Sequence, residues 1–241
     1  MTFGEWCEAS RALGLLRLCE SERWTPEAFA EELAAPGSAT IAAIVRRLDQ
    51  QGTATVQEFL ALALDFGACA IEWEMMVLTE SQQQRVRRPL TRVIAQLCKD
   101  NPERVAPWLS DQRWYVVRNV VHILGWIGGP NIVGLLSAAS RHTEPRVRQE
   151  VVAALAQAGT PASRPLLLEM LEGADSRIFC AALHQLSGER DREIARRLLG
   201  FLQSPSFGER PVEECRGIYL ALASVGDDDV RQLEDVVPAV P

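Results

Sequence analysis

Histidine and cysteine, the residues best suited to metal binding and acid–base chemistry, are few and scattered in this chain of 241 residues. His122, His142 and His184 lack the H-x-x-x-H spacing that places two ligands on one helix face, and no cysteine is near enough in sequence to complete a zinc site. The sequence contains no nucleophile turn of the G-x-S-x-G type, no P-loop and no dinucleotide fingerprint. We therefore expect no enzymatic activity, no metal and no cofactor.

The acidic residues do not form a pattern typical of catalysis either. Glu72 and Glu74 flank Trp73 in an apolar stretch, and residues two apart on a helix point to different faces, so a paired acid and base is not expected. We expect both carboxylates at the solvated edges of a buried helix. The run from Asp227 to Asp229 suits a helix N-terminus, and because adjacent helix residues face apart, we expect no metal there.

An arginine, a histidine and a tryptophan share one face of a predicted helix. Arg118, His122 and Trp126 follow each other at intervals of four residues, and Asn119 lies beside them. Arginine and tryptophan dominate the binding energy of protein interfaces. We therefore predict a partner-binding site with Arg118, Asn119, His122 and Trp126. The alternative is that Trp126 covers a neighbouring helix and that His122 is simply solvated.

The elements that position these residues repeat along the chain at a nearly fixed step. Similar sequence segments, here called phrases, begin at Val86, Val116, Val147 and Ile178, at steps of 30, 31 and 31 residues. Each phrase has apolar residues at helical spacing, and Gly159 supplies a C-terminal stop to the clearest one. A fixed period of this length indicates stacked helical hairpins, none of which can bury its apolar face alone.

Each repeat is predicted to consist of an A helix, a short polar turn and a B helix, and the phrases are the B helices. Upstream, a B helix over 55–67 follows an A helix over 40–50. Downstream, a B helix over 214–226 follows after a longer step, whose excess belongs to the loop 203–211. We count six hairpins and expect the first two and the last to be irregular. Residues 1–35 add two further helices.

Aligning the phrases arranges their side chains in rows across successive B helices. One row contains Arg118, Gln149, Cys180 and Arg216, and the next contains His122, Ala153, His184 and Leu220. In a solenoid the B helices line the concave surface, so these rows would face a bound partner. We therefore add Gln149, His184 and Arg216 to the predicted partner-binding residues.

These units resemble HEAT-like repeats of the short bacterial type, a group that includes phycobilin-lyase-type repeats. The resemblance is carried by residues 111–128 and 144–159, in which an acidic residue or proline precedes Val-Arg, then Ala/Val-x-x-x-Leu and glycine. It covers residues 81–226, and the period is shorter than the ~40–47 residues of most HEAT units. The resemblance implies an all-α right-handed superhelix used for protein binding or, in rarer branches, catalysis.

The resemblance also implies a ladder of Asp/Arg pairs between neighbouring turns. Phe179 replaces the arginine of the pattern in one repeat, so we expect the ladder at Glu144 with Arg148 and, less regularly, at Asp111 with Arg118. Because each repeat reuses this turn, we expect these charges to be structural.

We therefore predict an all-α fold: a right-handed α-solenoid of about six HEAT-like helical hairpins with an irregular helical N-terminal cap. Residues 1–54 form the irregular N-terminal helices, as a cap or divergent repeat, and residues 55–241 form the solenoid. The final predicted A helix, over 227–237, lacks a B helix, so it is either the cap or the point where a longer protein continues.

The net charge and its distribution along the chain indicate which class of partner the protein binds. The net charge of −7 weighs against non-specific nucleic-acid binding, although residues 81–159 carry 11 basic and 5 acidic side chains. We expect a non-enzymatic scaffold or adaptor that binds another protein on the concave face. The alternative is a HEAT-like nucleic-acid-binding protein or a DNA-repair-type enzyme that uses the basic central repeats. The oligomeric state stays open.

Cysteine usage and hydropathy bear on the compartment. The six cysteines form no C-x-x-C pair, and the N-terminus lacks the basic start and apolar core of a signal peptide. The most apolar stretch, 59–78, is interrupted by three acidic residues, so we expect no membrane span. A reduced, cytoplasmic protein is the expectation.

Overall fold

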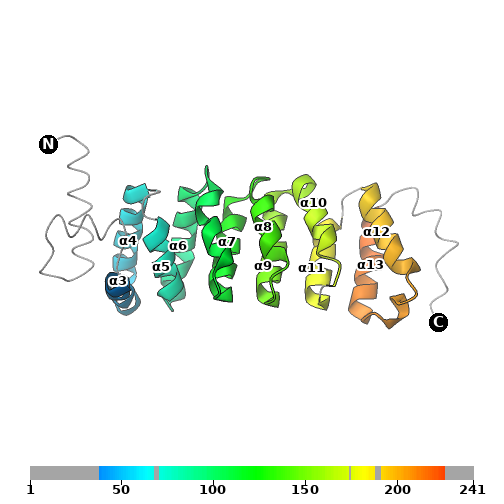
Figure 1. The fold of residues 1–241 in the computed structure, drawn as a ribbon, viewed down its shortest axis with the longest axis horizontal. Helices are drawn as coiled ribbons and strands as arrows, with labels where there is room; N and C mark the ends of the chain where they lie inside the picture. Colours follow the sequence, from blue (N-terminus) through cyan, green and yellow to red (C-terminus); the bar gives the residue numbers. More distant parts are fainter. Residues whose placement is uncertain (1–37, 68–70, 174, 188–190, 226–241) are drawn as a thin grey trace, which may run out of the picture. The chain divides into compact units, whose positions relative to one another are not determined.

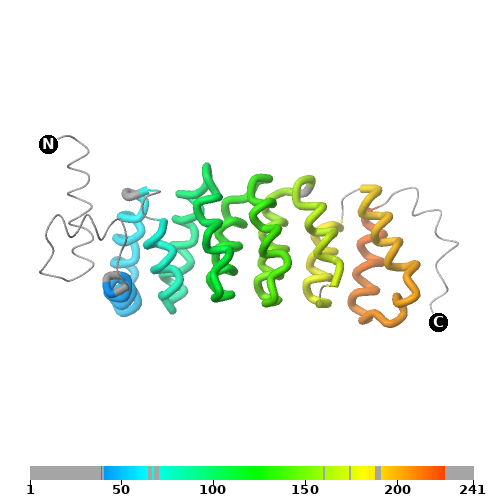
Figure 2. Tube along the Cα trace, viewed as in Figure 1, coloured from blue at the N-terminus to red at the C-terminus, as the bar shows by residue number. Residues whose placement is uncertain are grey.

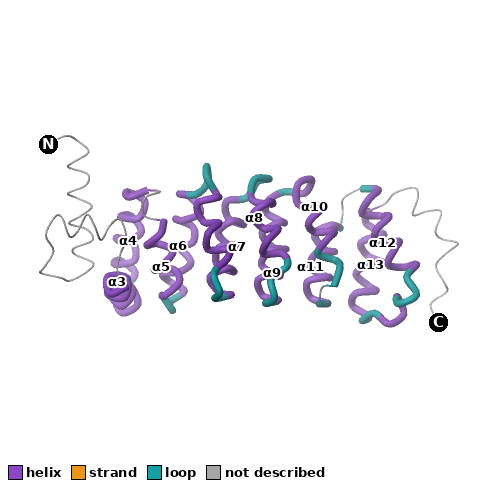
Figure 3. Tube along the Cα trace, in the orientation of Figure 1, coloured by secondary structure: helices purple, strands orange, loops and turns teal. Residues whose placement is uncertain are grey.

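α-Helices and short 3₁₀-helices account for the regular structure, and no strand occurs in the described residues (Figures 1 and 3). The computed structural model describes residues 38–67, 71–173, 175–187 and 191–225. The predicted helices within residues 1–35 and over 227–237 lie outside them. The chain divides into an N-terminal unit ending at Ile127 and a C-terminal unit beginning at Gly128. The boundary predicted at residues 54 and 55 stays a prediction.

Three hairpins form the described part of the N-terminal unit. They are α3 (Ser38–Gln50) with α4 (Thr53–Phe66), α5 (Ile71–Glu80) with α6 (Gln84–Leu97), and the 3₁₀-helix η2 (Pro102–Ser110) with α7 (Trp114–Ile127). The A elements α3 and α5 pack against each other, and the B helices pack in the order α4, α6, α7. The A elements and B helices thus lie in separate layers, as the hairpin prediction requires.

Three more hairpins form the C-terminal unit as far as the structure describes it, up to residue 225. They are α8 (Ile132–Ser140) with α9 (Pro145–Ala158), α10 (Thr160–Glu169) with α11 (Ser176–Leu186), and α12 (Arg192–Gln203) with α13 (Val212–Val225). Here α8 packs against α10, and the B helices pack in the order α9, α11, α13, so neighbours in sequence are neighbours in space (Figure 2). The longer step before α13 holds the short helix η3 (Phe207–Glu209) in the predicted loop.

The A element of the third hairpin is the irregular one, although we expected irregularity in the first two hairpins and the last. Residues 102–110 form a 3₁₀-helix rather than an α-helix. Proline lacks the backbone N–H that an α-helix needs in its interior, and η2 begins with Pro102 and contains Pro107. The prolines alone do not explain the 3₁₀ winding, because α10 also contains a proline at its start and one inside, Pro161 and Pro165, and is α-helical.

The predicted apolar stripes form the core. The first residues of the four clearest phrases, Val86, Val116, Val147 and Ile178, are all buried, and so is Leu155. The equivalent position in α13 is Glu214, a buried carboxylate. It accepts hydrogen bonds from Ser176 Oγ at 2.6 Å and from Arg210 at 2.8 Å, which satisfies both of its oxygens.

Glycines end two of the B helices, as predicted. Gly159 follows α9 with a φ of 93°, and Gly128 and Gly129 follow α7 with φ of 68° and 77°. Side chains with a Cβ rarely adopt these left-handed conformations, so glycine is the residue that stops the helix at these points. Asp175 caps α11, the B helix that follows α9, by accepting hydrogen bonds from the backbone N–H groups of Arg177 and Ile178.

Candidate partner-binding surface

Trp126 is held in a fixed position while it remains exposed. Its side chain lies on α7 and is 46% exposed. The indole Nε1 donates a hydrogen bond to Nε2 of His122 at 3.1 Å, and the guanidinium of Arg92 on α6 stands 4.8 Å from the centre of the indole ring. The predicted grouping of His122 with Trp126 is therefore confirmed as a contact.

Arg118 and Asn119 have different surroundings. Arg118 is exposed on α7, whereas Asn119 is half-buried. The side-chain oxygen of Asn119 accepts a hydrogen bond from Arg87 on α6 at 2.9 Å. In this arrangement Asn119 helps to hold α6 and α7 in register.

The structure adds three residues of α6 that the sequence interpretation missed. Arg88, Arg92 and Gln96 are exposed, and they stand two, six and ten residues after Val86, as Arg118, His122 and Trp126 do after Val116. The signal was present in the alignment of the phrases, but the predicted rows began one repeat too late. We call these six exposed residues the arginine–tryptophan face: Arg88, Arg92, Gln96, Arg118, His122 and Trp126.

In the C-terminal unit, the predicted residues are exposed on consecutive B helices. Gln149 lies on α9, His184 on α11 and Arg216 on α13, and α11 packs against both of its neighbours. Cys180, which is in the row of Gln149 and Arg216, is half-buried. Burial raises the pKa of its thiol, and the nearby charges of Glu214 and Glu213 raise that pKa further. The thiol is therefore held in its protonated, weakly nucleophilic form.

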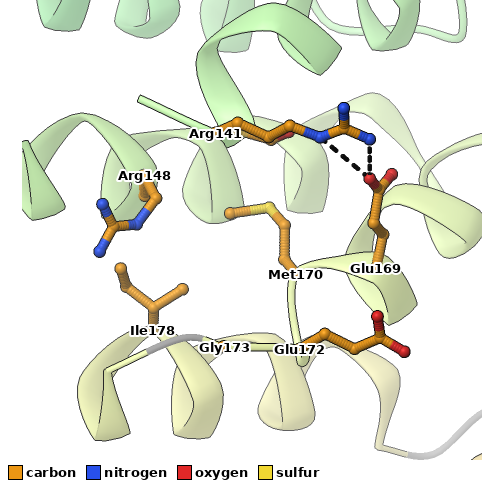
Figure 4. Close-up of a pocket in the computed structure, with 8 residues that line it drawn as sticks. Arg141, Arg148, Glu169, Met170, Glu172, Gly173 and Ile178 are labelled. Atoms are coloured by element: carbon orange, nitrogen blue, oxygen red, sulfur yellow. Dashed lines mark hydrogen bonds and ion pairs between the residues drawn. The ribbon is translucent and has the colours of Figure 1, made fainter. Parts of the chain in front are cut away.

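A small pocket of about 380 Å³ lies at the turns of the C-terminal unit (Figure 4). Arg141 forms an ion pair with Glu169 at its rim, and Arg148, Met170 and Ile178 line it (Figure 4). Arg148 donates to the backbone oxygens of His142 and Thr143 at 2.6 and 3.0 Å. The pair of Arg141 with Glu169 ties one turn to the next, and Arg148 ties α9 to the turn before it, as expected of structural charges.

The pairing within this ladder differs from the expectation. Arg148 forms its ion pair with Asp175, the cap of the next B helix, at 3.6 Å, and Glu144 pairs with Arg146 at 3.8 Å. Asp111 pairs with Arg113 at 2.9 Å, and the hydrogen bond from Arg113 lowers the pKa of Asp111. Of these three arginines, only Arg148 thus reaches an acidic residue of the following repeat, whereas Arg113 and Arg146 pair with the acidic residue two positions before them.

Glu74 contradicts the expectation of a solvated carboxylate. Glu72 is exposed, but Glu74 is 0% exposed, and both of its carboxylate oxygens lack a hydrogen-bond partner among the described residues. Burial raises the pKa of Glu74 to about 8. Burial, with a further contribution from the charge of Glu74 and opposition from Arg104, raises the pKa of the buried Cys98 thiol to about 11.

Glu74 and Cys98 do not line the open cleft that the N-terminal unit contains. That open cleft, of about 660 Å³, is bordered by residues of α5 and η2 that include Glu72, Met76 and Trp108. Among the described residues, no three histidine, cysteine or acidic side chains gather closely enough to hold a metal ion. Within the same part of the chain, every helix is too short or too polar to cross a membrane.

Comparison with known families agrees with the helical architecture. Residues 102–187 and residues 132–210 each match the family model of HEAT repeats. The matched region runs from η2 to the start of the loop after η3 and includes hairpins of both units. No curated protein matches the chain. Residues 102–210 are therefore HEAT-like repeats, and the described residues form an all-α fold.

Proposed function

We propose that this chain is a non-enzymatic scaffold or adaptor that binds another protein through the exposed surface of its B helices. HEAT repeats generally mediate protein interactions, and residues 102–210 consist of such repeats. The observation that carries the proposal is the exposed Trp126, held by His122 and Arg92. An aromatic anchor that is already ordered loses little conformational entropy when a partner covers it.

The location of Glu74 and Cys98 supports a non-enzymatic role. A general acid or base must reach the proton that it transfers. Glu74 and Cys98 are both buried, and neither lines the described clefts. Their raised pKa values are explained by burial in the core of the N-terminal unit, without any catalytic role.

A pull-down from cells of the source organism tests the proposal. The full-length tagged chain should retain a stoichiometric protein, and the double substitution Arg118→Glu and Arg216→Glu should reduce its recovery about tenfold or more. Both side chains are exposed on B helices, so their charge reversal should leave the fold unchanged.

The matched control is the double substitution Arg46→Glu and Arg196→Glu. These two arginines are also exposed, but they lie on the A helices α3 and α12. The control protein should retain its partner. Equal recovery by the wild type and by the Arg118/Arg216 variant would show that the B helices do not form the binding surface.

A further inference from the structure

The charge of the arginine–tryptophan face has a single sign. The helices α6 and α7 contain five arginines and no acidic residue, over 84–97 and 114–127. The nearby carboxylates of Glu80 and Asp111 both pair with Arg113, which lies outside the two helices. The field above these B helices is therefore positive, although the chain as a whole carries a net charge of −7.

Two of the α6 arginines have structural partners, and two are available to a ligand. Arg85 donates to the backbone oxygen of Asp49, and Arg87 donates to Asn119. Arg88 and Arg92 are exposed and form no ion pair within the described residues. The guanidinium of Arg92 does contact the ring of Trp126, but this cation–π contact leaves the donor edge of the guanidinium accessible.

The spacing of these two arginines matches an extended peptide. Residues four apart on an α-helix are separated by a rise of about 6 Å. In an extended chain, alternate side chains lie on one face about 6.6–6.8 Å apart. Two carboxylates separated by one residue could thus reach Arg88 and Arg92 together, each by a fork-shaped pair of hydrogen bonds. An apolar side chain further along the peptide would cover Trp126.

We propose that the arginine–tryptophan face binds an extended acidic segment of a protein partner, with two acidic residues separated by one position and an apolar residue beyond them. This inference rests on the proposed protein-binding function and specifies the chemistry of the partner. A short acidic segment fits better than a nucleic acid. The basic face is short, because it covers only the helices α6 and α7, and the net charge of −7 on the chain opposes the binding of a long polyanion.

Selection from a random peptide library with the full chain as bait tests the inference. The enriched peptides should be acidic, with Asp or Glu at alternate positions and an aliphatic or aromatic residue nearby. A fluorescein-labelled peptide from this pool should bind about tenfold or more weakly to the Arg88→Glu/Arg92→Glu variant, and its binding should weaken as salt rises. The Arg46→Glu variant is the control in the same unit and should bind like the wild type.

A second variant, Arg88→Gln/Arg92→Gln, is the control for misfolding caused by charge reversal, because it removes both positive charges without adding acidic residues. Its binding should also fall. Enrichment of neutral or basic peptides, or peptide binding that neither variant changes, would overturn this inference and leave the proposed function standing. A short DNA duplex that binds more tightly than the acidic peptide and is lost in the same variants would overturn it in favour of a nucleic acid. An absence of any enriched peptide would count against both proposals.

Discussion

At the scale of single residues, Trp126 and Glu74 are both unusual, but only Trp126 follows from the sequence. The intervals of four between Arg118, His122 and Trp126 predict a shared helix face, and the contact of His122 with Trp126 confirms it. The two-residue spacing of Glu72 and Glu74 also predicts different faces correctly. It does not show which face is packed, because the packing depends on α6 and α3, which lie elsewhere in the sequence.

Glu74 should make stability depend on pH. The folded state raises the pKa of Glu74 from its ordinary 4.5 to about 8, so between these values the folded chain holds a proton that the unfolded chain has released. Stability should therefore fall as pH rises through this window, by up to about 1.4 kcal/mol per pH unit. Urea unfolding followed by tryptophan fluorescence, repeated between pH 5 and about pH 9, measures this slope.

The substitution Glu74→Gln should remove most of this slope and should stabilise the protein at pH 8 and above, because a neutral amide replaces a buried carboxylate. The control is Glu72→Gln, at an exposed position, which should unfold like the wild type at every pH. An unchanged slope in the Glu74→Gln protein would show that another group causes the pH dependence.

At the scale of helices, the repeat pattern predicts the B helices well and the A elements less well. The stripe of Val147, Val151 and Leu155 is buried in α9, as the spacing of apolar residues requires. The 3₁₀ winding of η2 did not follow from the period, since the spacing of apolar residues predicts where an A element lies but not how tightly it is wound. The ion pair of Arg148 with Asp175 was missed because it joins two repeats.

Leu155 tests the register of α9. It is 0% exposed, and Leu155→Ala should lower the free energy of unfolding by about 2–5 kcal/mol through lost burial and the cavity that remains. The exposed Gln157 on the same helix provides the control, because Gln157→Ala should change stability little. Denaturant unfolding of the two variants gives the comparison, and a Leu155→Ala protein as stable as the wild type would contradict the register.

Glu214 replaces an apolar residue at the first position of its phrase, and a set of specific contacts compensates for its burial. Arg210 pairs with it and also stands 5.0 Å from the ring of Phe179. Glu214→Gln removes the charge but keeps the size, and we expect a loss of about 1–3 kcal/mol in thermal or urea unfolding. The exposed neighbour Glu213 is the matched control. If Glu213→Gln and Glu214→Gln have equal effects, the buried pair contributes no stability.

At the scale of the whole molecule, the period of the sequence and the match of residues 102–210 to HEAT repeats lead to the same architecture. The six predicted hairpins are all present in the described residues. The division after Ile127 was not predicted, although Gly128 and Gly129 end α7 there much as Gly159 ends α9. A helix stop recurs in several repeats, so composition alone cannot distinguish an ordinary turn from a boundary between units.

Site-specific photo-crosslinking tests the central claim, that the B-helix surface binds a protein, most directly. A benzophenone amino acid is placed in the full chain at Gln96 or Arg118, which are exposed on α6 and α7, or at Arg46 or Met76, which are exposed on the A helices α3 and α5. After irradiation in cells, the first pair of positions should yield one shared protein adduct, and the second pair should not. Adducts from Arg46 or Met76, with none from Gln96 or Arg118, would contradict the claim.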